Sequence, residues 1–385
     1  MSSPVRRRVA IMQPRLLHYR IDLFNQLRER CASRNIELRL VHGQATASEK
    51  VRQDEGTLDW ADRVTNRYVS IGGRDILWQP LTRDLARSDL VVVMQENRIL
   101  SNYPLLFGLK PAMTKIAYWG HGQNFQSRAP DGLREKWKKW LINRVDWWFA
   151  YTQMTVDLLN ASGYPSERIS CLNNAVDTKA FASQVSAIRE DERVRLRESL
   201  ACTPESKIAI FCGSLYPDKR LELMVAAGDL ICKGLKDFCL VVIGDGPSAG
   251  YLREIAKTRS WLHMVGTQRG QAKAAYFSIA DVMLNPGLLG LHILDSFSIG
   301  LPLISTTDAP HSPEVAYLES GVNGEMVAND AVSYANAVLK ILVDPVYRQR
   351  ISAGASAAGQ KFSVENMVET FEAGILKCLE HPSLH

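Results

Sequence analysis

The stretch ADVMLNPGLLGLHILDSFSIGLPLIST, residues 280–306, contains the features that decide the fold. An apolar, strand-like run ends in a Pro-Gly turn, and a loop with a second glycine then leads into an apolar helical segment. Another strand-like run, LPLIST, follows directly. Two short apolar strands joined through a helix are typical of a parallel β-α-β unit. The stretch therefore predicts an α/β domain, with Asp295 as the single acid between Pro286 and Pro302.

The same alternation of apolar strands and helices extends over both halves of the chain. It predicts two doubly wound, Rossmann-like domains that face a central cleft. The expected strands, some with their turns, are 8–12, 36–42, 89–94, 115–120, 147–152 and 168–174, then 207–213, 238–247, 262–266, 280–287 and 301–306. We expect a first domain at 1–182, a polar linker at 183–206, a second domain at 207–360, and a C-terminal helix at 361–385 that packs toward the first domain.

Composition and charge exclude several classes of protein. Of the 385 residues, 46% are hydrophobic and 23% are charged, which is typical of a soluble globular protein. A net charge of +5 without a concentrated basic face argues against a nucleic-acid partner. The apolar run near the N-terminus is too short for a signal peptide, and no run is long enough to span a membrane. Seven scattered cysteines without a C-x-x-C pair indicate reduced thiols, so we expect a cytoplasmic protein.

Metal-binding patterns are missing from the sequence. It contains no HExxH, no D-x-D and no cluster of histidines and cysteines. Protein-held catalytic metals usually need such spacings. We therefore expect no bound metal and no cofactor.

Two strand ends carry residues suited to an anionic ligand. GSLYPDKR places Lys219 and Arg220 at a helix start, where cations oppose the helix dipole unless an anion is bound. A solvated helix end is the alternative. YWGHGQN places His121 between two glycines after a strand, which favours close approach of a ligand over a purely structural histidine.

Two further patterns remain open at this point. GDGP, residues 244–247, follows a strand and serves either as a structural turn or as a ligand contact. The segment 133–151 mixes Lys136, Lys138, Lys139 and Arg144 with Trp137, Trp140, Trp147 and Trp148. Such a segment either binds an anionic membrane surface or presents a solvated face beside a buried strand that Trp147 and Trp148 begin.

Taken together, these motifs resemble those of glycosyltransferase family 4. The resemblance rests on GSLYPDKR, VVIGDGP, ADVMLNPG with GLHILDSFSIGLPLIST, and EVAYLESGVNGEMV in the second half, and on WGHG and NNAVDTKAF in the first. It implies a two-domain GT-B fold and a retaining enzyme that uses a nucleotide-sugar donor.

Position by position, the resemblance implies roles for individual residues. Lys219 matches the lysine that binds the donor diphosphate, and Arg220 supplies the charge of an arginine that Ser214 replaces. His121 matches a histidine near the transferred sugar, and we expect these three charged or ionisable residues to be catalytic. The implied donor-site residues are Gly213, Ser214, Asp245, Gly246, Val265, Gly266, Thr267, Gly287, Leu288, Leu289, Gly290, Leu291, His292 and Asp295, and the acceptor-site residues are Arg15, Tyr19, Arg20, Glu96 and Asn97.

One position departs from the family pattern, which has two glutamates with seven residues between them. Asp295 stands at the second position, where the carboxylate binds the ribose hydroxyls, but Gly287 stands at the first. The departure leaves recognition of the sugar hydroxyls to the backbone amides of Leu288–Leu291 and to His292.

The resemblance implies transfer of a sugar from a UDP- or GDP-sugar to a lipid-linked or glycan acceptor, in surface polysaccharide biosynthesis. The location would be cytoplasmic, or peripheral on the inner face of the cell membrane. Three alternatives remain. One is a sugar-nucleotide 2-epimerase using Glu96, Asp131 and Glu314, and another is a binding protein with a decayed transferase site. The third is a serine hydrolase using Ser248 of GPSAG, which Asp281, Asp295 and His311 follow in the order of a hydrolase triad.

Overall fold

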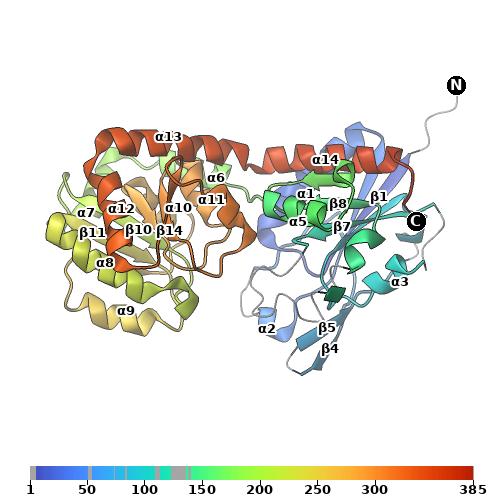
Figure 1. The fold of residues 1–385 in the computed structure, drawn as a ribbon, viewed down its shortest axis with the longest axis horizontal. Helices are drawn as coiled ribbons and strands as arrows, with labels where there is room; N and C mark the ends of the chain where they lie inside the picture. Colours follow the sequence, from blue (N-terminus) through green and yellow to red (C-terminus); the bar gives the residue numbers. More distant parts are fainter. Residues whose placement is uncertain are drawn as a thin grey trace. The chain divides into compact units, whose positions relative to one another are not determined.

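The computed structural model describes residues 6–50, 54–72, 74–82, 85–108, 113–122, 136–137 and 140–384. The chain forms two compact units (Figure 1). The first comprises Met1–Asp177 together with Val364–His385, and the second comprises Thr178–Ser363.

The first unit is built on a seven-stranded parallel sheet in the order β3-β2-β1-β6-β7-β8-β9. Its strands are β1 (Arg7–Gln13), β2 (Ile36–His42), β3 (Asp62–Arg63), β6 (Leu90–Met94), β7 (Lys115–Gly120), β8 (Trp147–Ala150) and β9 (Ile169–Cys171). A separate antiparallel hairpin consists of β4 (Arg67–Ile71) and β5 (Arg74–Trp78). The helices are α1 (Ile21–Ser33), α2 (Ala47–Lys50), α3 (Asn102–Leu106), α5 (Gln153–Ala161) and α14 (Val364–Glu380), with short turns η1 (His18–Arg20), η2 (Leu85–Arg87), η3 (Ile142–Arg144) and η4 (Ser166–Arg168).

The C-terminal helix α14 completes the core of the first unit. Phe371 packs on Phe149, with ring centroids 4.4 Å apart, and edge-on against Trp119 at 5.0 Å. The buried Glu372 carboxylate accepts from Arg30 on α1 at 2.6 Å and from Arg34, directly after α1, at 3.1 Å. Apolar packing and a shared ion pair therefore hold α14 against α1 and the sheet.

The second unit is built on a six-stranded parallel sheet in the order β12-β11-β10-β13-β14-β15. Its strands are β10 (Lys207–Cys212), β11 (Phe238–Ile243), β12 (Leu262–Gly266), β13 (Val282–Leu284), β14 (Leu303–Thr306) and β15 (Gly324–Val327). The helices are α6 (Lys179–Ser186), α7 (Glu190–Ser199), α8 (Leu221–Gly234), α9 (Ala249–Ala256), α10 (Gly270–Ser278), α11 (Ile293–Ser298), α12 (Ala331–Val343) and α13 (Pro345–Lys361), with turns η5 (Pro217–Lys219) and η6 (Pro313–Tyr317).

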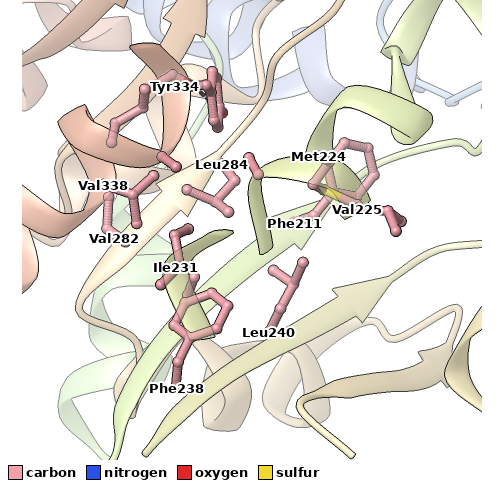
Figure 2. Close-up of a cluster of buried hydrophobic side chains, with 14 of the residues drawn as sticks. Phe211, Met224, Val225, Ile231, Phe238, Leu240, Val282, Leu284, Tyr334 and Val338 are labelled. Atoms are coloured by element: carbon pink, nitrogen blue, oxygen red, sulfur yellow. Dashed lines mark hydrogen bonds between the residues drawn. The ribbon is translucent and has the colours of Figure 1, made fainter. Parts of the chain in front are cut away.

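The core of the second unit lies between the sheet and the helices α8 and α12 (Figure 2). The strands contribute inward-pointing residues because alternate positions of a strand face the same side. The buried residues labelled there are Phe211, Phe238, Leu240, Val282 and Leu284 from the strands, Met224, Val225 and Ile231 from α8, and Tyr334 and Val338 from α12. This rigid core fixes the strand ends from which the candidate site is built.

The segment expected to be a linker is part of the second unit, so the predicted boundary needs correction. The units meet at Asp177 and Thr178 instead of residue 182. Phe181 on α6 packs edge-on against Phe277 on α10, with centroids 5.1 Å apart, and Arg197 on α7 donates to the Ile279 carbonyl at 3.3 Å. The polar composition of 183–206 reflects α7, which has no buried residue of its own.

Two observations bear on the expected location of the protein. Within the described ranges, no helix is both long enough and apolar enough to cross a membrane. All seven cysteines are free thiols.

Candidate functional site

The candidate site of the second unit lies where β10, β11 and β13 end. The sheet order reverses between β10 and β13, and open α/β sheets bind ligands at the carboxyl ends of strands near such a reversal. The loops after β10 and β11 are tied together, because the Gly213 amide bonds to the Ile243 carbonyl at 3.0 Å and the Leu215 amide to the Asp245 carbonyl at 3.0 Å. At Gly244 a Cβ atom would lie 1.9 Å from the Gly213 carbonyl oxygen, so only glycine fits there.

Lys219 is a buried cation at this edge of the sheet. It is 3% exposed, and its Nζ donates to the Leu288 carbonyl at 2.5 Å. Burial lowers the pKa of Lys219 to about 8, since desolvation disfavours the ammonium form. A buried ammonium with a destabilised charge is suited to bind an anion, which would restore the favourable interaction lost on burial.

Arg220 supplies a second cation at the start of α8. It adopts a left-handed backbone conformation, with φ of 53°, which costs about 1 kcal/mol or more for a residue other than glycine. Its guanidinium donates to the Thr306 hydroxyl at 2.8 Å and to the Asp308 carbonyl at 2.6 Å. These bonds on β14 and its following loop hold Arg220 in the strained conformation and fix its charge near the strand ends.

We expected the four backbone amides of Leu288–Leu291, in the loop after β13, to bind sugar hydroxyls, but only two of them are open to a ligand. The Leu288 amide donates to the Asp218 carbonyl at 2.8 Å, and the Leu289 amide donates to His311 Nδ1 at 3.1 Å. Both donors are therefore engaged within the protein. Within the described part of the chain, the amides of Gly290 and Leu291 donate no hydrogen bond, so these two of the four expected donors remain open to a ligand.

Gly287 lies in a backbone contact instead of a carboxylate position. A Cβ atom at Gly287 would lie 2.1 Å from the Asp218 carbonyl oxygen and 2.4 Å from the Lys219 Cα. No side chain fits there unless one of the two backbone segments moves. The close approach of this loop to η5 is what brings the Leu288 carbonyl to the Lys219 ammonium.

Two ionisable residues follow in α11 and just before it. His292 is half-buried, and its Nε2 is buried without a hydrogen-bond partner in the described structure. Burial, with the charges of Lys219 and Lys273, lowers the pKa of His292 well below its usual value, so the imidazole is neutral. Asp295 forms an ion pair with Lys273 at 2.7 Å, and both side chains are about one-fifth exposed.

The remaining predicted donor residues lie at the carboxyl ends of β10, β11 and β12. The Asp245 carboxylate is exposed and accepts from the Gly246 amide at 2.8 Å and from Arg253 at 3.2 Å. The Gly244 amide donates to the Gly266 carbonyl at 2.9 Å, which brings the Val265–Thr267 segment beside the GDGP turn. Ser214 is exposed on the loop after β10.

Three further residues belong to this site, and the sequence analysis assigned none of them to it. Lys273 carries the charge that pairs with Asp295, and Asn285 donates to the carbonyls of Gly287 at 3.1 Å and Leu288 at 3.2 Å. His311 Nδ1 accepts from the Leu289 amide, so Nε2 holds the proton and donates to the Thr306 carbonyl at 2.7 Å. Asn285 stands in the quoted NPG turn and was detectable there, whereas nothing in the local sequence marks Lys273.

In the first unit, His121 lies at the carboxyl end of β7, near Tyr151 and the predicted acceptor residue Arg20. Its ring centroid is 4.2 Å from that of Tyr151, and the Tyr151 hydroxyl accepts from Arg20 at 2.8 Å. Gln123 and Asn124 of the same motif lie outside the described residues. The structure therefore brings His121 and Arg20 to the same aromatic neighbourhood.

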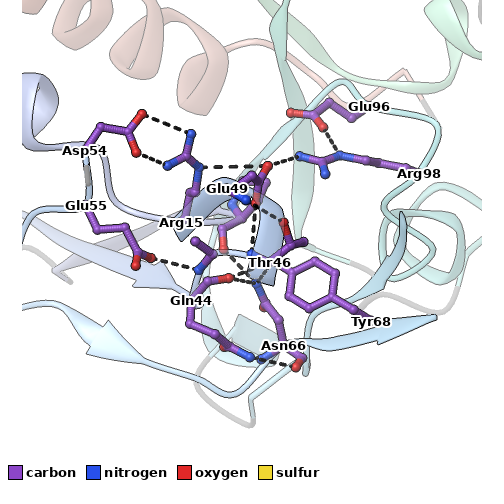
Figure 3. A network of polar contacts seen from close by, with 12 residues as sticks. Arg15, Gln44, Thr46, Glu49, Asp54, Glu55, Asn66, Tyr68, Glu96 and Arg98 are labelled. Carbon is purple, nitrogen blue, oxygen red and sulfur yellow. Dashed lines mark hydrogen bonds and ion pairs between the residues drawn. The ribbon is translucent and has the colours of Figure 1, made fainter. Parts of the chain in front are cut away.

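The other predicted acceptor residues belong to a network of ion pairs (Figure 3). Arg15 pairs with Asp54 through both guanidinium nitrogens, and Glu96 pairs with Arg98 at 2.6 Å. Glu49 lies between the two arginines, 4.0 Å from Arg15 and 3.5 Å from Arg98. These contacts pair the charges of Arg15 and Glu96 within the first unit, and their role toward an acceptor stays a prediction.

Tyr19 and Asn97 lie at the edges of this region. Both are half-buried, and the Asn97 carbonyl accepts from Tyr103 at 3.2 Å.

Within the described residues, Asp281 and His311 of the hydrolase alternative are bonded elsewhere, and the epimerase set is described only in part. Both ring nitrogens of His311 are bonded to Leu289 and Thr306, and the Asp281 carboxylate is bonded to Arg348 and the Ile208 amide, so neither residue serves Ser248. Glu96 is paired with Arg98, Glu314 is buried, and Asp131 lies outside the described residues.

Comparison with known proteins finds a family match within the second unit. Residues 206–344 match the family model of glycosyl transferases group 1. The chain is 26% identical over 216 residues to a GDP-mannose-dependent alpha-(1-6)-phosphatidylinositol monomannoside mannosyltransferase of Mycolicibacterium smegmatis, covering 52% of this chain and 53% of that protein. It is 25% identical over 198 residues to a D-inositol 3-phosphate glycosyltransferase of Actinosynnema mirum, covering 47% of each. The chain thus spans about half the length of the curated relatives it matches.

A solved structure extends the likeness to both units. The complex of Anabaena Alr3699/HepE with UDP matches with a TM-score of 0.67 and 15% identity, over 96% of this chain and 99% of that chain. The fold is therefore GT-B, as the sequence predicted.

Proposed function

We propose that this chain, a GT-B protein with a group 1 glycosyl transferase segment, is a retaining glycosyltransferase that uses a nucleotide-sugar donor. The observation that carries the proposal is the buried Lys219 in the turn η5, between β10 and α8, with Arg220 beside it. The acceptor in this proposal is a glycan or a lipid-linked sugar, as in surface polysaccharide biosynthesis.

The chemistry needs a stabilised leaving group. When the sugar departs from its nucleotide, negative charge develops on the distal phosphate. Lys219 and Arg220 are held in place before the reaction, Lys219 by the Leu288 carbonyl and Arg220 by Thr306 and Asp308. Such preorganised charges stabilise a developing anion without reorganisation, and each contributes about 10²–10³-fold in rate.

We assign the other donor contacts by their surroundings. Asp295, oriented by Lys273, would accept hydrogen bonds from the ribose hydroxyls. The open amides of Gly290 and Leu291 and the Nε2 atom of His292 would face the sugar or its phosphates.

Retention of configuration follows from the same arrangement in this proposal. Asp295 is engaged with Lys273, so it is not placed as a nucleophile for a covalent intermediate. The departing phosphate would instead accept the proton of the acceptor hydroxyl as the new bond forms on the same face of the sugar. His121 would lie near the transferred sugar from the first unit.

An exposed aromatic cluster supports peripheral binding to an anionic membrane on the cytoplasmic side. Trp137 and Trp140 stack at 4.9 Å, Trp140 stacks on Phe107 at 5.8 Å, and Arg144 lies over Trp140 at 4.4 Å. Each of the three aromatic residues is more than 40% exposed. Aromatic rings beside a cation are typical of surfaces that bind the lipid headgroup region. Lys138 and Lys139, expected in the same surface, lie outside the described residues.

Nucleotide binding followed by product detection tests the function. The full chain is first titrated with UDP, GDP and ADP. It is then incubated with the sugar forms of the nucleotide that binds and with lipid-linked glycans, and the products are identified by mass spectrometry. We expect one nucleotide to bind and one glycan to gain a sugar. Failure of all three nucleotides to bind would refute the proposal.

A further inference from the structure

Arg20, at the end of η1, is a buried cation in the first unit. The residue is 5% exposed, and its guanidinium lies over the Trp119 ring, 4.3 Å from the ring centroid. One nitrogen, Nη2, donates to the Tyr151 hydroxyl at 2.8 Å. The Tyr19 ring also lies 5.6 Å from the guanidinium.

Most hydrogen-bond donors of this guanidinium are unused. Nε and Nη1, which carry most of its N–H bonds, are buried and have no hydrogen-bond partner among the described residues. No described carboxylate lies within ion-pair distance of Arg20, whereas Arg15 is paired with Asp54. Leaving a buried charged donor without a hydrogen-bond partner is destabilising, so a bound anion would be favoured there.

The aromatic contacts explain the position of Arg20 but not its open donors. Trp119 interacts with the face of the guanidinium, whereas the N–H bonds point outward from its edge. Glu96 lies near enough to influence Tyr151, yet its carboxylate is already bonded to Arg98 at 2.6 Å. Among the described residues, therefore, none forms an ion pair with the Arg20 charge.

The place of Arg20 in the fold favours a ligand. β1, β7 and β8 end here, next to the point where the order of the first sheet reverses between β1 and β6. Open α/β sheets bind ligands at this edge. His121 and Tyr151 lie at the same edge with ring centroids 4.2 Å apart, and the buried Thr152 hydroxyl also has no hydrogen-bond partner in the described structure.

We propose that Arg20 binds an anionic group, a carboxylate or a phosphate, carried by the acceptor. The open Nε and Nη1 donors supply charge-assisted hydrogen bonds to its oxygen atoms, and Trp119 and Tyr151 hold the guanidinium in place for them. The acceptor would then be a phosphorylated or uronic-acid-type sugar, which specifies the acceptor left general in the proposed function. That the anion belongs to a sugar acceptor rests on the proposed function, whereas anion binding by Arg20 does not depend on it.

Anion binding to the full chain tests the proposal. The titrations use inorganic phosphate and glucuronate, with glucose as the neutral control, in a Lys219→Met background that removes the buried cation of the second unit. We expect one of the anions to bind and glucose not to bind at the same concentration, and the anion that binds identifies the chemistry. Arg20→Gln should weaken that binding by about ten- to a hundredfold, the loss expected for hydrogen bonds to a charged group.

Control variants separate a lost contact from a damaged fold. Arg28 lies over the Trp60 ring at 4.7 Å and is exposed, so Arg28→Gln removes a similar stacked arginine and should leave anion affinity unchanged. Arg20→Lys keeps the charge and should retain part of the affinity. Anion affinity that survives in Arg20→Gln, or no anion binding at all, would overturn the inference. Nucleotide binding to the chain with Lys219 intact is measured separately, and its absence would refute the proposed function alone.

Discussion

Gly287 lies directly against the backbone of Lys219, because a Cβ atom added to the glycine would come within 2.4 Å of the Lys219 Cα. The loop after β13 and the turn before α8 are packed backbone to backbone, and the Leu288 amide bonds to Asp218 across the contact. The position where the family pattern has its first glutamate is therefore filled by a structural contact that also positions the buried lysine.

Replacing Gly287 by alanine should separate the two loops. The added methyl group meets backbone atoms, which cannot rotate away as a side chain can, so we expect a loss of about 1–3 kcal/mol in the free energy of unfolding. Nucleotide affinity should fall with it. The matched control is Gly290→Ala, where the nearest atom is the Ser312 hydroxyl oxygen at 3.7 Å and stability should change little. Equal stability of the two variants in urea unfolding would contradict the described contact.

Lys219→Met should stabilise the protein while it weakens donor binding. Because the pKa of Lys219 falls from 10.5 to about 8 on folding, keeping the buried amine charged at neutral pH costs about 3 kcal/mol. Loss of its hydrogen bond to Leu288 offsets part of this gain, so we expect a net rise of about 1–2 kcal/mol at pH 7.

The pH dependence of unfolding checks the sign of this prediction. The unfolded lysine holds its proton more tightly than the folded one, so wild-type stability should rise as pH rises from about 8 to 10.5. The advantage of Lys219→Met should shrink over the same range. If Lys219→Met is less stable than wild type at pH 7, contacts within the protein already offset the cost of burying the Lys219 ammonium, and the prediction is wrong.

Asp295→Asn should remove discrimination between ribose and deoxyribose. Wild type should bind the preferred nucleoside diphosphate about ten- to a hundredfold more tightly than its 2′-deoxy form, if the carboxylate accepts from the ribose hydroxyls. The variant should bind both forms alike. The comparison uses this ratio because the substitution also frees the Lys273 charge, which would itself change diphosphate affinity. Preserved discrimination would assign the ribose to another residue.

His311 should make the donor loop sensitive to mild acid. Burial lowers the pKa of His311 below its usual value, and its neutral Nδ1 accepts from the Leu289 amide. Because the unfolded histidine protonates first, this contribution to stability is present above about pH 6.5 and is lost as pH falls toward the lower folded pKa. Hydrogen exchange at Leu289 should therefore slow less steeply with falling pH than the intrinsic, base-catalysed rate does, because protection is lost. His311→Asn should show no such pH dependence.

Trp137 and Trp140 should contribute to membrane binding. The double change Trp137→Ser with Trp140→Ser should weaken binding to vesicles of phosphatidylglycerol and phosphatidylcholine by about tenfold or more, since each ring loses apolar contact area. Trp78→Ser is the control, because Trp78 is also exposed, at 40%, but lies on the β4–β5 hairpin. Unchanged vesicle binding, measured by sedimentation, would remove the aromatic cluster from this role.

The sequence predicts the parallel framework well, because buried strands such as β6 and β11 are unbroken apolar runs. Residues directly after these strands could also be predicted as candidate site residues, because the carboxyl ends of parallel strands meet at one edge of the sheet. Trp147 and Trp148 were correctly expected in a buried strand, and both are fully buried in β8.

Other features depend on contacts that the sequence does not display. Lys273 on α10 meets Asp295 on α11 only in the folded chain, because the two residues stand 22 positions apart in the sequence. The β4–β5 hairpin exposes Val69 and Ile71, so it lacks the alternation of buried and polar residues that predicts a strand. The Leu288 amide was expected to be open, but the close approach at Gly287 directs it to Asp218.

The placement of α14 has a consequence for how the protein is made. Phe371 covers Trp119 and Phe149, yet it is synthesised after the whole second unit. On the ribosome the second unit is therefore complete while the first still exposes the sheet face that α14 covers. The order of folding should be inverted relative to the order of synthesis, and a chaperone that holds nascent chains would find its binding surface on the half that emerged first.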